Sequence, residues 1–438
     1  MKFEKRFILQ RLFFIGFWLA TCTGFVSDLV WHHGESSILR TASLLAVDVI
    51  LLFLALCTLR KAFDIILISS FVIISFFSTC ILNDSGILSW INGTRYFYGM
   101  LFLVPILRYF YGNERRHELF VKSLDKQLFI FLCLQVPAVL YQLFMHGAGD
   151  RVGGTMGDGF SGIISVSIYL SSFYLLRKRL DHNNMLRSLY KNWIYIFLLF
   201  PTFLNETKVS FILLIVYFIL LSPLDRKYFV RMTFLLPLIA LLVGAGSYFY
   251  LSTETGDNRL ELSTEFFQNY LDADLDDLEG AMEYAEKNHS EMFDVPRVAK
   301  FAIIPLVFNA HPGHTLLGFG TNIYAHGAHM EASTFYKEYD WLLNGTSPWL
   351  FSIIMQLGLA GIIWTTIFFV SLFYRKPPAH KSRNLNSQLF LLAIIVLMLF
   401  YSDHWGYANF CYIAFTFHFC SWEKREDLKV QEGDLPSS

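Results

Sequence analysis

The sequence has little charge for its length. Only 16% of its 438 residues are Asp, Glu, Lys or Arg, while 54% are hydrophobic, and soluble domains carry about 25% charged residues. The formal net charge is −1, which argues against a nucleic-acid-binding protein and against an acidic tail protein. Because the chain has too few charges to cover a water-facing surface, its composition predicts an integral membrane protein.

Cysteine patterns that would indicate disulfides or zinc are also missing. The six cysteines lie in apolar stretches, and no Cys-x-x-Cys pair occurs. These positions argue against a disulfide framework and against a zinc site. The sequence also lacks the Gly-Lys-Ser/Thr of a phosphate-binding P-loop, and it contains no internal repeat. We therefore expect neither a metal nor a cofactor.

Long apolar runs are abundant. A membrane-spanning helix needs about 20 mostly apolar residues. Twelve candidates occur, near residues 7–26, 38–58, 63–82, 88–108, 127–146, 160–176, 192–205, 208–222, 232–251, 348–373, 387–402 and 408–421. The first run is too long for the apolar core of a signal peptide and lacks a convincing cleavage site. The predicted fold class is an all-α integral membrane protein with about twelve transmembrane helices.

Lysine and arginine are distributed unevenly between alternate loops. With the N-terminus inside, the inner segments hold 25 of these residues and the outer segments hold nine. Because Lys and Arg are enriched in cytoplasmic loops, both termini are predicted to be cytoplasmic. The predicted organisation is nine helices in residues 1–251, a large outer loop over 252–347, three helices in 348–422 and a cytoplasmic tail over 423–438.

The outer loop between the ninth and tenth helices is the largest polar segment. Residues 252–346 contain 16 acidic and five basic residues. The acidic stretch 272–286 predicts a solvated helix. The apolar stretch 295–309 is too short to span a bilayer, so it predicts a helix that lies on the membrane surface.

Four of the nine outer basic residues lie outside the long loop and stand out, because basic residues are disfavoured on this side. They are Arg40, Arg95, Arg151 and Lys208. For Arg40 we favour an interfacial position at the end of its span, and for Arg95 a functional role and ion pairing are equally compatible with the sequence.

Arg151 opens a loop of residues 151–162 that contains five glycines. Glycines such as Gly153 and Gly154 let backbone N–H groups approach an anion, and arginine offers a bidentate contact to phosphate or carboxylate. Lys208 follows a polar break between two short apolar runs, and such breaks line cavities or pack on protein at membrane depth. Arg151 and Lys208 are therefore candidate phosphate-binding residues in one cavity. The alternatives are a flexible linker for the first and neutralisation by Glu206 for the second.

The long loop ends in a histidine-rich run. His311-Pro-Gly-His314 precedes Leu317-Gly-Phe-Gly320, and Asn322, His326 and His329 follow. The spacings match no zinc-enzyme pattern. Histidine titrates near neutral pH, so general acid–base work is the predicted role, with an ordinary polar loop as the alternative. Further on, Gly358 and Gly361 form a small-residue face suited to helix packing.

Together these features resemble the O-antigen polymerase and ligase superfamily of bacterial inner membranes. The number of spans and the single large outer loop carry the resemblance, together with three short motifs. Arg151-Val-Gly-Gly-Thr resembles the family's Arg-x-x-Gly loop, and Asn205-Glu-Thr-Lys208-x-Ser210 resembles its Ser-Arg/Lys segment. His311-Pro…Leu317-Gly-Phe-Gly320 and Leu357-Gly-Leu-Ala-Gly361 resemble its Pro-x-x-Gly-x-Gly and Gly-x-x-Gly elements.

The resemblance implies a metal-independent glycosyltransferase with a GT-C-like helical fold. Such an enzyme would join polyprenyl-diphosphate-linked oligosaccharides, as donor and acceptor, into O-antigen, capsule or exopolysaccharide at the periplasmic face of the inner membrane. Arg151 and Lys208, with Arg95, would meet the charge of the diphosphate, and His311 or His314 would deprotonate the acceptor hydroxyl. Gly153, Gly154, Asn322 and His326 are further candidates for substrate contacts. The implied partners are the bilayer, a chain-length regulator and a flippase, without nucleic acid.

Two other functions remain open. A ligase of the same superfamily would transfer the finished glycan to lipid A–core. Ligases typically carry His-Asn or His-x-Ser before the tenth span, where this sequence has Asn344-Gly-Thr346-Ser347. A flippase or transporter of lipid-linked oligosaccharides would show two halves of similar pattern and mid-membrane charges, and no such halves occur. A Wzy-type polymerase is therefore the leading hypothesis.

Overall fold

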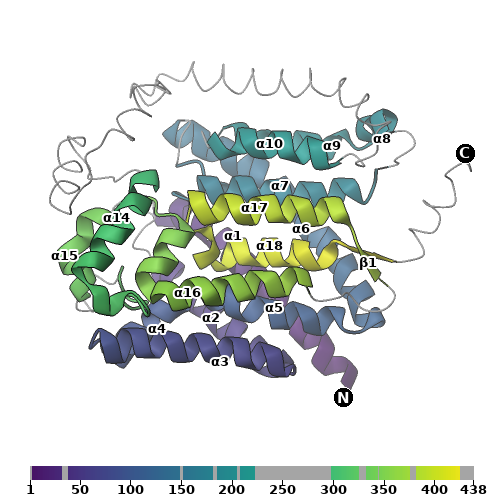
Figure 1. Ribbon diagram of the computed structural model, residues 1–438. Helices are drawn as coiled ribbons and strands as arrows, with labels where there is room; N and C mark the ends of the chain where they lie inside the picture. Colours follow the sequence, from purple (N-terminus) through teal and green to yellow (C-terminus); the bar gives the residue numbers. More distant parts are fainter. Residues whose placement is uncertain are drawn as a thin grey trace, which may run out of the picture.

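A computed structural model describes residues 2–31, 38–147, 151–180, 185–204, 208–221, 297–324, 332–343, 345–374 and 381–424. The predicted ninth span at 232–251, the acidic helix at 272–286 and the tail after residue 424 lie outside these residues. Within them the chain is built almost entirely of helices that lie roughly side by side along one axis (Figure 1).

The helices follow one another through the whole described chain. They are α1 (Lys2–Trp31), α2 (Ile38–Thr58), α3 (Ala62–Phe76), α4 (Ile87–Arg95), α5 (Tyr98–Tyr111), α6 (Glu114–His146), α7 (Ser161–Arg177), α8 (Met185–Lys191), α9 (Trp193–Phe197), α10 (Lys208–Leu221), α14 (Arg297–Ala310), α15 (Thr334–Leu343), α16 (Trp349–Tyr374), α17 (Leu385–Tyr401) and α18 (Ala408–Cys420). Short helical turns are η2 (Phe77–Leu82), η3 (Gly154–Met156), η4 (Phe200–Phe203), η5 (Pro312–His314) and η6 (His404–Gly406).

Five helices in the described residues are long and apolar enough to cross a membrane. They cover Phe7–Leu29, Ile38–Thr58, Ala62–Leu82, Glu114–His146 and Trp349–Phe373. Seven shorter apolar helices accompany them. The prediction of an all-α membrane protein is confirmed at this level. The expected single helix at 88–108 was wrong, because the chain divides there into α4 and α5.

The shorter helices α5, α7 and α18 form the interior of the bundle. Every residue of α18 from Asn409 to Phe419 is buried, and so are most residues of α5 and α7. Helix α18 packs against both of them. A helix that is apolar on all sides belongs in a protein core, and neighbouring helices rather than lipid surround these three. Their length is therefore not set by the thickness of a bilayer.

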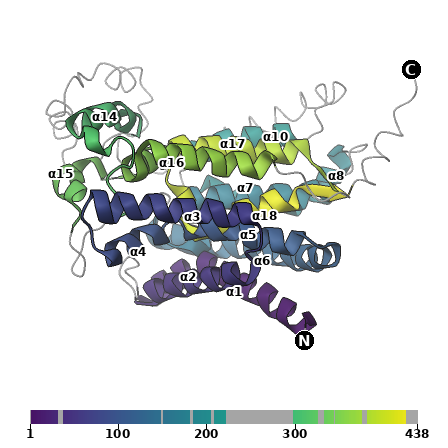
Figure 2. The same cartoon turned by 60° about the horizontal axis from the view of Figure 1, so that its bottom comes forward.

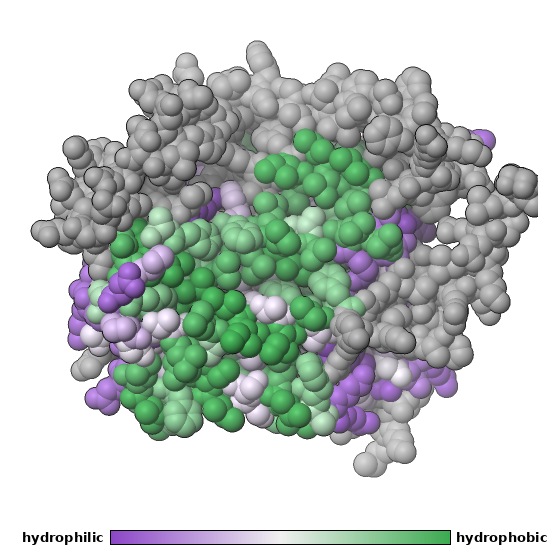
Figure 3. Space-filling model, viewed as in Figure 1, coloured by the Kyte–Doolittle hydropathy of each residue, from purple (hydrophilic) through white to green (hydrophobic). Residues whose placement is uncertain are grey.

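The outer helices present an apolar surface. Large apolar side chains are exposed along α2, α3, α16 and α17, among them Val49, Ile66, Ile363 and Phe400. Figure 3 shows this surface as a continuous apolar region with polar residues toward its two ends. An exposed apolar patch of this extent marks a membrane or a protein contact, which agrees with the composition.

The bundle has two distinct ends. At the strand end, β1 (Lys381–Arg383) pairs antiparallel with β2 (Trp422–Lys424), a pairing that the all-helical prediction did not anticipate. Helices α6 and α17 also begin at this end, where the side chains of Asn113 and Asn384 accept the N–H groups of Arg116 and Ser387 and cap the two helices.

The opposite end, here named the loop end, contains the described residues among 83–97, 151–161, 297–349 and 401–408. Figures 1 and 2 show α14 and α15 there, beside α4 and the start of α16. Helix α14 confirms the helix predicted at 295–309, and it packs against α16 through Ile303 and Val307. The segments that the predicted topology assigns to one side of a membrane thus meet at one end of the bundle.

Candidate functional site at the loop end

The glycine loop after α6 is held by side chains of two helices. Gln142 accepts the N–H of Gly154 at 2.7 Å and donates to its carbonyl oxygen at 3.1 Å. Gln135 accepts the N–H of Thr155 at 2.9 Å and donates to its hydroxyl at 2.8 Å. Asp28 of α1 accepts the N–H of Asp158 at 2.8 Å. These bonds make the loop a rigid connection between α6 and α7.

Glycine is required in this loop for conformation and for space. Gly154 has φ +58°, and a Cβ atom there would lie 2.4 Å from Gln135 Oε1. A Cβ atom on Gly153 would lie 1.8 Å from the carbonyl oxygen of Gly157. The N–H of Gly154 is already bonded to Gln142, so the structure assigns these two glycines a scaffolding role. Their predicted contact with substrate stays a prediction.

Arg151 lies at the start of this scaffold with its side chain exposed. No ion pair or hydrogen bond joins it to another residue in the described ranges. The next residue, Val152, is buried against Val139 and Leu204, so the Arg151 loop touches the segment that leads to Lys208. Lys208 begins α10, and its side chain, like residues 205–207, lies outside the described part.

Arg95 has a partner within the bundle. Its Nε lies 2.6 Å from Asp48 Oδ2, and the two side chains are 28% and 17% exposed. A second contact joins its guanidinium to Asn92 Oδ1 at 3.5 Å. The structure thus shows the ion pairing that the sequence left open for Arg95, and its predicted role toward a diphosphate is untested.

The two glycine motifs of the outer loop and of α16 bind each other through the backbone. The N–H groups of Phe319 and Gly320 donate to the carbonyls of Met355 and Gln356 at 2.8 and 2.9 Å. The N–H groups of Leu359 and Ala360 donate to Thr315 and Leu316 at 3.1 and 3.0 Å. Helix α16 is broken between these pairs, and the loop supplies the hydrogen bonds that the break removes.

Gly358 lies at this break with φ +59° and ψ −150°, a region that only glycine adopts readily. A Cβ atom there would lie 2.6 Å from the carbonyl oxygen of Thr315. The helix-packing role favoured from sequence for Gly358 was therefore wrong as the main explanation. Its conformation permits the break that receives the loop.

The η2 turn, which continues α3, and the residues after it hold the same loop from the other side. Thr79 Oγ1 accepts the N–H of Thr321 at 2.9 Å, and Asn83 donates to the carbonyl of Gly318 at 3.2 Å. Asn322 is buried and donates to Ser85 Oγ at 3.0 Å. Its Oδ1 has no hydrogen-bond partner within the described structure. The predicted substrate residue Asn322 therefore has one polar atom without a protein partner.

His311 and His314 lie at the start of this loop, directly before and within η5. His311 Nε2 lies 2.8 Å from the Tyr339 hydroxyl and 3.3 Å from Glu338 Oε1. His314 stacks on the Phe319 ring with centroids 4.5 Å apart, and its Nδ1 lies 3.2 Å from the Gly318 carbonyl oxygen. His326 and His329 lie outside the described residues. His311 is the one of the two that touches a carboxylate, so it is the better oriented as a base.

Sequence reasoning missed a polar cluster on the link between α17 and α18. The Tyr96 hydroxyl donates to Asp403 Oδ2 at 2.5 Å, and Ser402 Oγ lies 3.4 Å from Asp403 Oδ1. Lys300 is completely buried, and its Nζ donates to Ser347 Oγ at 3.0 Å. The available sequence indication was an Asp-His pair in a short outer turn, because ionisable groups near membrane spans are costly and mark functional sites.

His404 follows Asp403 and is neutral in this environment. Burial, and secondarily the positive charge of Arg297, lowers its pKa from 6.5 to about 3. Its Nδ1 lies 2.6 Å from Ser402 Oγ, so the imidazole helps to orient the turn that carries Asp403.

Aromatic rings connect this cluster to the glycine loop. Phe160, at the end of that loop, contacts Tyr407 with ring centroids 5.3 Å apart, and Tyr407 contacts Tyr96 at 5.8 Å. The guanidinium of Arg40 lies 5.1 Å from the Phe160 ring. The glycine loop and the Asp403 turn are therefore connected through packed aromatic rings, with Arg40 beside them.

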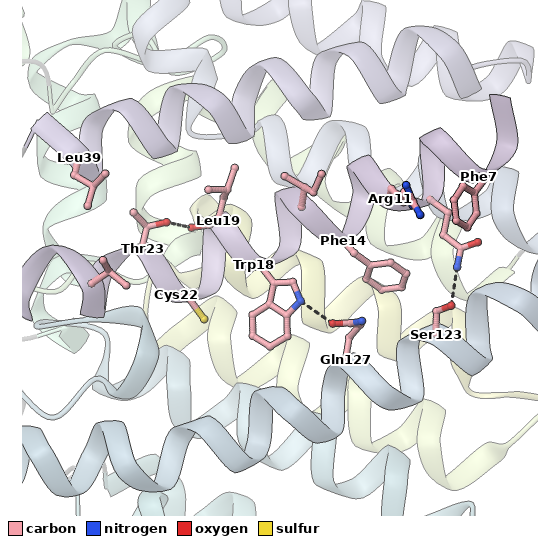
Figure 4. A pocket seen from close by; sticks show the side chains of 13 residues that line it. Phe7, Arg11, Phe14, Trp18, Leu19, Cys22, Thr23, Leu39, Ser123 and Gln127 are labelled. Atoms are coloured by element: carbon pink, nitrogen blue, oxygen red, sulfur yellow. Dashed lines mark hydrogen bonds between the residues drawn. The ribbon is translucent and has the colours of Figure 1, made fainter. Parts of the chain in front are cut away.

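A groove of about 770 Å³ runs along the outer surface of α1, facing α6 (Figure 4). Its walls are mostly apolar, and Figure 4 shows two hydrogen-bonded pairs of polar side chains that join α1 to α6 within it. Trp18 Nε1 donates to Gln127 at 2.7 Å, and Gln10 donates to Ser123 at 2.9 Å. The groove reaches from Phe7 to Val26 of α1 and to Leu39, next to Arg40.

The described residues contain no group of three or more His, Cys, Asp or Glu side chains that is arranged to hold a metal ion. No family model matches the chain, and no curated protein sequence matches it.

Proposed function

We propose that this protein polymerises polyprenyl-diphosphate-linked oligosaccharide repeat units into O-antigen, capsule or exopolysaccharide. The loop end would face the periplasm of a bacterial inner membrane, with both termini in the cytoplasm. About twelve spans in a GT-C-like arrangement, two short outer helices and the long outer loop would complete the enzyme. The reaction would need no metal, because protein cations would meet the charge of the leaving diphosphate.

The observation that carries this proposal is the convergence of separate motifs at the loop end. The Arg151 loop contacts the segment before Lys208 through Val152 and Leu204. The motif at 315–320 binds the motif at 357–361 through backbone hydrogen bonds. Motifs far apart in the sequence thus contact one another in two places at the same end of the bundle, which supports a shared binding site.

The surface groove supports a substrate with a hydrocarbon chain. Its path along α1 from Phe7 to Val26 corresponds to about 29 Å of helix rise, close to the roughly 30 Å of a bilayer core. A lipid chain in this groove would lead to Leu39 and Arg40, at the border of the loop end. Arg151 would then be an exposed cation available to a diphosphate.

The test is a strain from which the chain is deleted, with its glycans resolved on a polysaccharide gel. A polymerase predicts loss of the polymer ladder while single repeat units still cap the core. An uncapped core with accumulated lipid-linked polymer would instead identify a ligase, and an unchanged glycan profile would contradict both.

Complementation with Arg151→Ala should restore about 100-fold less polymer than the wild-type chain. One protein group that stabilises the charge developing on the diphosphate raises the rate by about that factor. Lys178→Ala is the matched control, since it removes an exposed cation at the strand end, and it should restore the full ladder. Membrane levels of both variants should equal those of the wild type. A normal ladder with Arg151→Ala would contradict the proposed role of this residue.

A further inference from the structure

The turn that carries Asp403 brings a carboxylate to the centre of the loop end. Its partners come from distant segments: Tyr96 joins α4 to α5, Tyr407 precedes α18, and Lys300 lies on α14. Tyr96 and Asp403 are separated by 307 residues, yet their oxygens are 2.5 Å apart. None of the motifs found in the sequence includes this cluster.

Asp403 is partly buried. Asp403, Tyr96, Tyr324 and Tyr407 each retain part of their surface accessible, although aromatic and polar groups of several helices surround them. Tyr324 donates to or accepts from Ser352 Oγ at 2.8 Å. Tyrosine offers an apolar face and a polar hydroxyl, so this cluster suits a ligand with both apolar faces and hydroxyl groups, such as a sugar ring.

The charges around Asp403 favour a carboxylate that accepts a proton. Burial raises the pKa of Asp403 above its ordinary value, while the hydrogen bond from Tyr96 and the positive charge of Lys300 lower it. The other titratable groups that face it are Tyr324, Tyr407 and the neutral His404. A carboxylate whose pKa is raised by burial is a stronger base than an ordinary carboxylate, which suits general-base catalysis.

We propose that Asp403 is the general base that activates the acceptor sugar. An oxygen of Asp403 takes the proton of the acceptor hydroxyl while the hydroxyl oxygen bonds to the anomeric carbon of the donor sugar. The bond from that carbon to the diphosphate oxygen breaks, and the diphosphate leaves with the electron pair, beside Arg151. This inference rests on the proposed polymerase function, and it assigns to Asp403 the step that the sequence assigned to His311 or His314.

The experiment measures polymerisation by the full chain in lipid nanodiscs with a synthetic polyprenyl-diphosphate-linked repeat unit. Asp403→Asn should lower kcat about 100-fold or more while the affinity for the lipid-linked substrate changes less than about twofold. Asn keeps an oxygen that accepts from Tyr96, so this variant preserves the local hydrogen bond. Asp125→Asn is the matched control, because Asp125 accepts from the Tyr174 hydroxyl at 2.7 Å at the strand end, and it should retain activity within about threefold.

A pH profile separates catalysis from a structural effect. Tyr96→Phe removes a hydrogen bond that stabilises the carboxylate, so the pKa of Asp403 should rise and the acid limb of the rate profile should move to higher pH. An unchanged acid limb in Tyr96→Phe, or normal kcat in Asp403→Asn, would overturn the assignment of the base. Failure of the wild-type chain to form polymer would overturn the proposed function itself, and with it this inference.

Discussion

The two ends of the bundle hold their ionisable side chains in different ways. At the strand end opposite charges are paired: Arg108 with Asp64, and Lys178 with Asp125 at 2.6 Å. At the loop end Arg95 is paired with Asp48, while buried Lys300 donates to the Ser347 hydroxyl, Asp403 accepts from the Tyr96 hydroxyl, and the positive charge of Lys300 acts on Asp403.

This difference agrees with the proposal, which places the reaction at the loop end. When a buried charge is matched by an opposite charge and by hydrogen bonds, these interactions offset the cost of removing it from water. A buried charge that is bonded to hydroxyl groups can still interact with a charged ligand or take up a proton. Under the proposed function, the buried charges of the loop end reduce the free energy of unfolding but would serve the reaction.

Arg108→Met should produce the largest loss of stability. The Arg108 and Asp64 side chains are only 9% and 5% exposed, and removing one partner of a buried pair costs about 3–5 kcal/mol. Lys178→Met is the control, because its pair is 42% and 26% exposed and such pairs contribute less than about 1 kcal/mol. Unfolding of both variants in detergent would measure the difference. Equal stability losses would contradict the distinction between the two pairs.

Gly358→Ala should have the next largest effect and should act at the loop end. Alanine would have to adopt φ +59° with its Cβ atom 2.6 Å from the Thr315 carbonyl oxygen, which we expect to cost about 2–3 kcal/mol. Gly86→Ala is the control, because nothing lies within 4 Å of its Cβ position. The same unfolding experiment measures both. A Gly358→Ala protein as stable as Gly86→Ala would show that the loop does not depend on the break in α16.

Acid should destabilise the loop end through His404. Its pKa is about 3 in the folded chain against an ordinary 6.5, so the unfolded chain binds the proton more readily. Stability from this group is complete above pH 6.5 and should fall by about 1.4 kcal/mol per pH unit as the pH drops toward 3. His404→Asn should flatten the stability profile over this range. Identical slopes for the variant and the wild type would refute the burial of a neutral imidazole.

The fold class was predictable because it depends on composition. A chain with little charge and long apolar runs must cover its apolar side chains with lipid or with a large core, whatever the details of packing. The five long apolar helices agree with this expectation. The break between α4 and α5 had a local indication, the run Asn92-Gly-Thr-Arg95 before Tyr96, but the apolar residues on either side of this run favoured a single span. The β1–β2 pair was not predictable either, because its strands have three residues each and lie far apart in the sequence.

The sequence predicted the candidate site only where neighbouring residues form a recognisable pattern. The glycines around Arg151 indicated an unusual loop, and the structure shows the positive φ angles that they permit. The conformation of Gly358 depends on residues 315–320, some forty positions earlier, so the local sequence suggested only helix packing. The surroundings of Asp403 depend on Tyr96 and Lys300, which lie in distant segments, so the Asp403-His404 pair was the one local indication of this cluster.

The most direct test of the account is polymerisation by the purified full chain. The chain would be reconstituted in vesicles with a synthetic polyprenyl-diphosphate-linked repeat unit and a metal chelator, and its products would be resolved by size. We predict a ladder of products, with one polyprenyl diphosphate released for each linkage formed. Absence of any product longer than one repeat, or a ladder that appears only after divalent metal is restored, would contradict it.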